Sequence, residues 1–144
     1  MTGYRTLLPF CFLLAIALTL ACGSNHKLQS VTVTPSTADA QNYPNGQVPF
    51  TATGVFSGSS SPTPLTSSQI QWCYGGSAAL GNPLAGVCAG NVAQFASVDQ
   101  NGLAQCTAQA QGMFYILAGV SAGSMNPDSG NQLTIFGSAL LACP

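Results

Sequence analysis

The chain has 144 residues, of which only 3% are charged, against about 25% in a typical soluble protein. The charged side chains are two basic and three acidic ones, and the formal net charge is -1. No basic surface is available to hold phosphates, so the composition excludes nucleic acid as a partner. A neutral polar surface of this kind suits a tethered protein better than one free at high concentration.

The amino-terminal segment has the features of an export signal. Arg5 supplies a positive charge near the start, and residues 7–20 are apolar apart from Pro9 and Thr19. That run is too short to span a bilayer comfortably, and it is typical of the apolar part of a signal peptide. We therefore expect residues 1–21 to be a signal peptide, residues 22–27 a polar tether and residues 28–144 one folded domain.

Cys22 follows this segment directly. Residues 18–24 resemble a bacterial lipobox, although Thr19 stands where that motif usually has Leu. The resemblance implies that Cys22 is acylated, becomes the mature amino terminus and anchors the protein to a membrane. The cysteine count favours this interpretation, because Cys11 lies in the signal and acylation of Cys22 leaves an even four. Ordinary signal cleavage after Ala21, with a free or intermolecular thiol at Cys22, is the alternative.

Short runs of alternating apolar and polar residues indicate β-strands in the rest of the chain. We expect strands over residues 28–34, ending at Pro35, then over 48–56, around Ile70 and Trp72, over 95–98, 103–107 and 112–120, and from Leu133 towards Cys143. Turn signals lie between them at Pro44-Asn45-Gly46, Asn101-Gly102 and residues 126–130. About seven short antiparallel strands with no convincing helix predict an all-β sandwich.

Several stretches also carry a family resemblance. They are Ser30-Val31-Thr32-Val33-Thr34-Pro35-Ser36, Gly46-Gln47 leading into Phe50-Thr51-Ala52-Thr53-Gly54, Trp72 after Ile70, Ala96-Ser97-Val98-Asp99-Gln100-Asn101-Gly102-Leu103, and Gly112. In this order they resemble the bacterial Ig-like domain of group 2, over residues 28–135. The resemblance implies an Ig-like β-sandwich in a surface or envelope protein, acting as a spacer or binding module without catalytic residues. The insertion at residues 75–90 and the four later cysteines depart from the family pattern.

Cys73, Cys88, Cys106 and Cys143 are expected to form two disulfides, because an exported chain meets an oxidising compartment. Pairing Cys73 with Cys88 would close the insertion, and pairing Cys106 with Cys143 would tie the last strand to the sheet, while the other pairings stay open. Loop-closure entropy gives about 3 and about 4 kcal/mol for these two bonds. A metal site made by the four cysteines is the alternative, and the sequence lacks the Cys-x-x-Cys spacing of zinc sites.

One strand has an unusual outward face. On residues 112–120, Met113, Tyr115 and Leu117 point away from the face that carries Phe114 and Ile116. The outward face of a sandwich strand is normally polar. Three large apolar side chains therefore predict a covered surface, whether by a partner, by a second copy or by a loop of the same chain.

Other side chains have competing structural and functional interpretations. Trp72 is expected in the core rather than as a sugar-stacking platform, as in Ig-like sandwiches. Tyr43 and Tyr74 are better candidates for exposed contacts with a glycan. Asp99 is expected to cap its own turn rather than to bind calcium together with Asp128.

Catalysis is not expected, and neither is a cofactor. The only histidine, His26, lies in the tether, and the chain has no Glu and three Asp far apart in sequence. A nucleophilic Ser therefore lacks a base, and paired-carboxylate chemistry lacks its pair. We predict a non-enzymatic envelope lipoprotein at an outer membrane or cell surface, with an Ig-like binding or adhesion module for a protein or glycan. The alternatives are a purely structural spacer and a carbohydrate-binding accessory module.

Overall fold

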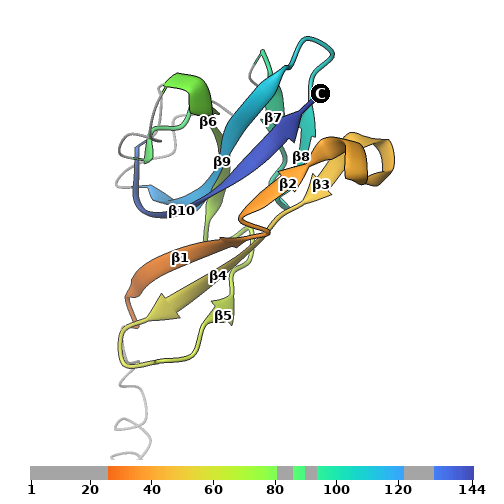
Figure 1. The fold of residues 1–144 in the computed structure, drawn as a ribbon. Coiled ribbons are helices and arrows are strands. Elements are labelled where there is room, and N and C mark those ends of the chain that lie inside the picture. Colours follow the sequence, from red (N-terminus) through yellow and green to blue (C-terminus); the bar gives the residue numbers. More distant parts are fainter. Residues whose placement is uncertain (1–25, 81–85, 90–93, 122–131) are drawn as a thin grey trace, which may run out of the picture.

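The computed structural model describes residues 26–80, 86–89, 94–121 and 132–144, so Cys22 and Asp128 lie outside the described residues. The described chain forms ten β-strands and three short 3-10 helices, with no α-helix among its residues (Figure 1). The strands are β1 (Leu28–Thr34), β2 (Thr37–Asp39), β3 (Gln47–Pro49), β4 (Thr51–Phe56), β5 (Thr63–Pro64), β6 (Gln71–Ser77), β7 (Ala96–Val98), β8 (Leu103–Cys106), β9 (Gly112–Ser121) and β10 (Leu133–Cys143). The 3-10 helices are η1 (Ala40–Asn42), η2 (Pro44–Gly46) and η3 (Ala78–Leu80).

The strands form two layers. Hydrogen bonds join them in the orders β1-β4-β5, β3-β8-β7 and β2-β10-β9-β6. Only Phe50 separates β3 from β4, so the first two groups continue into one another. In Figure 1, β7 and β8 lie alongside β9 and β10, and β1, β4 and β5 extend below them. Buried side chains from both layers belong to one apolar cluster, which includes Val33 and Phe50 from one side and Ile116 and Leu141 from the other. The expected all-β sandwich is confirmed.

Two details of the predicted strand set are wrong. The strands are more numerous than seven, because β2 and β5 are too short to show an alternating pattern and because the expected strand 48–56 divides at Phe50. There the chain passes from one hydrogen-bonded group to another, and the Phe50 N–H donates to the Gly102 carbonyl at 2.9 Å. The strands are also not all antiparallel, because β2 pairs in parallel with β10, from Thr37 opposite Leu140 to Asp39 opposite Ala142.

The main core lies where the alternating pattern places it. Val31 and Val33 on β1, and Phe114 and Ile116 on β9, are all buried. Trp72 is 6% exposed and lies in the same cluster, as expected for a core tryptophan.

The turn at Asn101-Gly102 lies directly against that tryptophan. Gly102 has a φ of +81°, and a Cβ atom there would lie 2.8 Å from the ring of Trp72. Glycine is therefore needed for its backbone conformation and for the close approach.

A second, smaller core lies on the opposite face of β9. Cys73, Cys88, Leu117 and Leu133 are buried together there, with Tyr115 and Phe136 packed against them; we call this cluster the outer core. The described part of the insertion folds back over it. The Ala89 N–H donates to the Tyr74 carbonyl at 2.7 Å, and a Cβ at Gly86 would lie 2.7 Å from the Phe136 ring. The chain itself therefore covers this part of the sheet.

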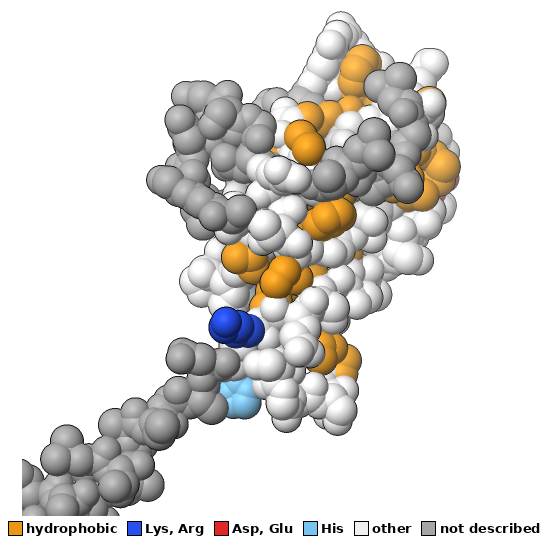
Figure 2. All heavy atoms as spheres, turned by 90° about the vertical axis from the view of Figure 1, so that its left-hand side faces the viewer, with side chains coloured by type: hydrophobic (Ala, Val, Ile, Leu, Met, Phe, Trp, Pro, Cys, Tyr) orange, Lys and Arg blue, Asp and Glu red, His pale blue; other side chains and the backbone are white. Residues whose placement is uncertain are grey.

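The molecule has two distinct ends. β1 begins at the lower end in Figure 1, together with the end of β4 and with β5, whereas β10 finishes at the upper end. Figure 2 shows one side of the molecule, with the single lysine and the single histidine of the described chain side by side at the lower end. Hydrophobic side chains are scattered above them among uncharged polar ones.

Candidate functional site

Both expected disulfides are present. The Cα atoms of Cys73 and Cys88 are 5.5 Å apart, and those of Cys106 and Cys143 are 5.8 Å apart. The first bond lies in the outer core, and the second joins β8 of one layer to β10 of the other. Within the described ranges, no three His, Cys, Asp or Glu side chains are grouped to hold a metal ion.

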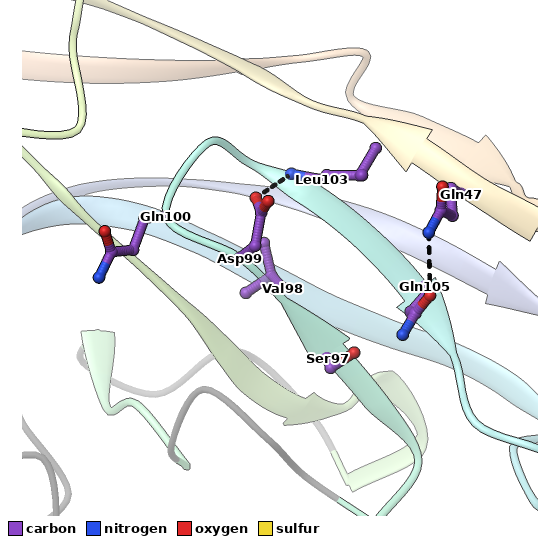
Figure 3. Close-up of a pocket in the computed structure, with 7 residues that line it drawn as sticks. All are labelled: Gln47, Ser97, Val98, Asp99, Gln100, Leu103 and Gln105. Atoms are coloured by element: carbon purple, nitrogen blue, oxygen red, sulfur yellow. Dashed lines mark hydrogen bonds between the residues drawn. The ribbon is translucent and has the colours of Figure 1, made fainter.

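A shallow pocket with both polar and apolar side chains lies on the outer surface of the β3-β8-β7 group. Its volume is about 410 Å³, and its polar lining consists mainly of Gln47, Ser97, Gln100 and Gln105 (Figure 3). The Gln47 Nε2 donates to the Gln105 Oε1 at 3.3 Å, so the two amides are held side by side across β3 and β8. Strand alternation explains the position of Gln105, because its neighbour Ala104 is fully buried in the main core.

Asp99 forms one edge of this pocket, but its carboxylate also holds the turn together. Its Oδ1 accepts hydrogen bonds from the N–H groups of Asn101 and Leu103, both at 2.8 Å. The expected turn-capping role of Asp99 is confirmed. The partner that calcium binding would need, Asp128, lies outside the described residues.

A second pocket, of about 330 Å³, lies beside η1, η2 and the end of β8. Tyr43 supplies its aromatic side chain, and Gln41, Asn45, Gln105 and Thr107 supply polar groups. Gln105 lines both pockets, so the two adjoin at this residue, and we describe them together as one region. We call the amides of this region, from Gln41, Asn45, Gln47, Gln100 and Gln105, the amide surface.

Local backbone geometry fixes the wall that carries Tyr43. The Asp39 Oδ1 accepts a hydrogen bond from the Gln41 N–H at 2.9 Å and so caps η1. Asn45 and Gly46 have φ values of 57° and 68°, as in the Asn-Gly turns that join short strands. Tyr43 lies between these two turns, half-buried against the main core. Its ring is therefore held in place rather than free in a loop.

The amide surface offers hydrogen bonds rather than charge. Each Gln or Asn side chain has both donor and acceptor groups. Among the side chains that line the two pockets, Asp99 has the one carboxylate, and its Oδ1 is already engaged with the turn. Such a region suits an uncharged polar ligand, with hydroxyl or amide groups to pair with the side chains and an apolar face to lie against Tyr43.

Tyr74, the other tyrosine suggested for exposed contacts, does not lie on the surface. It belongs to β6 and is 6% exposed, with its ring centroid 6.1 Å from that of Phe114. Burial raises the pKa of its hydroxyl above the usual 10.0, because the charged form would lose hydration. The periodicity around Ile70 and Trp72 placed Tyr74 on the same inward face, a signal that could have identified it as a core residue.

The three apolar residues proposed as a partner surface have different environments. Met113 is 40% exposed, whereas Leu117 is fully buried in the outer core. Tyr115 lies between these extremes and packs against the outer core. The three therefore do not form one surface open to a partner.

The amide surface itself was not foreseen from the sequence. Gln47 and Gln105 are 58 positions apart, and each alone is an ordinary outward-facing strand residue. Only the pairing of β3 with β8, which places Gln47 opposite Gln105, brings them together.

No helix among the residues described is long and apolar enough to cross a membrane. Comparisons with protein-family models, curated proteins and solved structures gave no match.

Proposed function

We propose that this chain is an exported bacterial envelope lipoprotein in which an acylated Cys22 anchors a non-enzymatic, Ig-like binding module. The module would bind an uncharged polar ligand on the amide surface. The observation that carries the proposal is the position of that surface. It lies on β3, β8 and the η1–η2 segment, away from the start of β1, where the anchor would attach (Figure 1).

The order of the strands supports the Ig-like part of the proposal. One layer follows the order β1, β4 with β3, β8 and β7, and the other contains β6, β9 and β10. When the strands are lettered in the order in which they occur along the chain, the first layer matches the ABED sheet of an immunoglobulin-type sandwich and the second matches its CFG sheet. β2 then adds to the free side of β10.

The two disulfides support export, because such bonds persist in oxidising compartments and are rare in the cytosol. They also account for all four later cysteines and leave Cys22 as the one cysteine outside both the signal and the disulfides. Acylation of Cys22 requires that this cysteine is not in a disulfide, which agrees with the count of cysteines.

The intact mass of the native protein, extracted from membranes, tests the anchor directly. We expect a chain that starts at Cys22 and carries acyl mass, with four thiols that react with an alkylating agent only after reduction. A chain that starts at another residue, or a Cys22 without acyl mass, would overturn the lipoprotein proposal.

Carbohydrate recognition is a second candidate function, favoured by one observation. Tyr43 lies in a pocket with Gln41, Asn45 and Thr107, and an aromatic ring beside amide and hydroxyl groups matches the apolar and polar faces of a sugar. Titration with cello-, malto- and chito-oligosaccharides, followed by calorimetry, tests it.

We expect Tyr43→Ala to weaken such binding by about tenfold, the loss typical of an aromatic anchor. Tyr115→Ala is the matched control, because Tyr115 is also half-buried but lies on the outer face of β9. Equal weakening by both variants would count against a site at Tyr43. The absence of binding to any of these sugars would leave a protein ligand or the spacer role as the remaining alternatives.

A further inference from the structure

The residues next to the expected anchor are fastened to the folded domain. The His26 Nδ1 is 2.8 Å from the Ser57 carbonyl oxygen, and the Lys27 N–H donates to the Ser57 Oγ at 2.9 Å. The Ser57 N–H in turn donates to the Lys27 carbonyl at 2.8 Å. The last two residues of the expected tether therefore belong to the lower end of the sandwich. We call this end, formed by residues 26–28 and 54–65, the tip.

Very little chain remains between the tip and the anchor. Three residues lie between Cys22 and His26, and the four steps of a fully extended chain from Cys22 to His26 span at most about 14 Å. A lipid on Cys22 would therefore hold Lys27 close to the headgroup layer. Surface charges act on one another mainly within the Debye length, which is about 8 Å at physiological ionic strength, and a tether this short allows Lys27 to come that close to the headgroups.

The distribution of charged side chains favours contact between the tip and an anionic membrane surface. Lys27 is the only lysine or arginine after the expected signal peptide, and it lies on the tip with its side chain exposed. No Asp or Glu occurs in residues 26–34 or 51–65. The two described carboxylates, Asp39 and Asp99, are bound into η1 and the β7–β8 turn instead. When the tip approaches an anionic surface, Lys27 is therefore attracted to it, and no Asp or Glu side chain of the tip is repelled.

The tip also carries half-exposed apolar side chains. Leu28 and Leu65 lie over Gly54, where an added Cβ would come within 3.0 Å of the Leu65 side chain, and both remain partly accessible. Phe56, at the end of β4, is partly accessible as well. Figure 2 shows hydrophobic side chains close to the lysine on this side. Contact with the polar–apolar boundary of a bilayer would bury part of this area.

We propose that the tip docks on the membrane surface, with Lys27 against the phosphates of anionic phospholipids, so that the amide surface is held away from the bilayer. This inference rests on the acylation of Cys22 put forward above. It adds that the module is not a freely swinging domain on a lipid but has a preferred orientation.

Hydrogen exchange of the acylated protein, reconstituted into vesicles, tests the orientation. The probe is a pair of vesicles, one of phosphatidylcholine alone and one of phosphatidylcholine mixed with phosphatidylglycerol. We expect the amides of residues 56–61 to exchange several-fold more slowly on the anionic vesicles. Those of residues 107–111, between β8 and β9 at the other end, should exchange equally on both. High salt should remove the difference, because it screens the attraction of Lys27 to phosphate.

Two variants separate local charge from net charge. Lys27→Gln should lower the affinity of the tip for anionic vesicles by about fivefold, the contribution of one basic residue near such a surface, and should remove most of the protection. Gln111→Glu changes the net charge by the same amount at an exposed position between β8 and β9, and it should leave the protection intact.

The outcomes distinguish this proposal from the one on which it rests. Protection of residues 56–61 that is equal on both vesicles, or that Lys27→Gln leaves unchanged, would overturn docking through Lys27 while the anchor stands. A native chain without acyl mass would overturn the anchor itself, and with it the docking.

Discussion

The two faces of β9 are packed in different ways. Phe114 and Ile116 point into the main core, where both layers of the sandwich bury them. Leu117 points the other way and is equally buried, but its cover is the Cys73–Cys88 bond and the described part of the insertion. Ile116 and Leu117 are adjacent and equally buried. The opposite layer of the sandwich covers Ile116, whereas a disulfide-linked loop covers Leu117. Burial alone therefore does not reveal how an apolar residue is protected.

The largest effect is expected from the disulfide that spans the layers. Replacing Cys106 and Cys143 by Ala should lower the free energy of unfolding by about 4 kcal/mol, because the bond closes a loop of 37 residues. Replacing Cys73 and Cys88 should cost about 3 kcal/mol, because their loop has 15 residues. Urea denaturation of both variants measures the difference. A larger loss from the shorter loop would mean that the outer core contributes more than chain entropy.

The next effect separates the two cores directly. Ile116→Ala and Leu117→Ala should each cost about 3 kcal/mol, since each removes a fully buried side chain. In a background that lacks the Cys73–Cys88 bond, Leu117→Ala should cost less than about 1 kcal/mol, because the loop that covers it is released. Ile116→Ala should cost the same with or without that bond. If Leu117→Ala also costs the same with and without the disulfide, the outer core does not depend on its cross-link.

A smaller effect is expected at the β7–β8 turn. Asp99→Ala should lower the free energy of unfolding by about 2 kcal/mol, because the N–H groups of Asn101 and Leu103 lose their acceptor. Asp99→Asn keeps an oxygen acceptor and should cost less than about 1 kcal/mol. Thermal denaturation of the two variants compares them, and equal losses would show that the charge, not the hydrogen bonds, stabilises the turn.

The smallest effect concerns Tyr74. Its pKa is raised in the folded state, so its contribution to stability is fully present below the unfolded pKa of 10.0 and is lost as the pH rises above it. The free energy of unfolding of the native protein should therefore fall at alkaline pH. Tyr74→Phe should flatten that fall, because it removes the hydroxyl that ionises. An unchanged alkaline slope in the Tyr74 variant would assign the loss of stability to another group.

Much of the main core could be predicted from local pattern. Period-two alternation correctly placed Val31, Val33, Phe114 and Ile116 inside, because successive side chains of a strand point to opposite faces. The same alternation was not sufficient to predict the surroundings of Met113, Tyr115 and Leu117. It identified a face that needed cover but could not choose among a partner, a second copy and the chain itself. That choice depends on where the insertion folds, which local alternation does not encode.

The sequence by itself determined the alternating strands, the turn at Asp99 and the composition from which export and two disulfides were expected. These properties depend on neighbouring residues or on counts, so they can be read without coordinates. The tertiary structure decided the parallel pairing of β2 with β10, the outer core and the amide surface. Each of these depends on which distant segments become neighbours, as when β3 and β8 bring Gln47 against Gln105. Such contacts arise from packing over the whole chain, and no short stretch of sequence contains them.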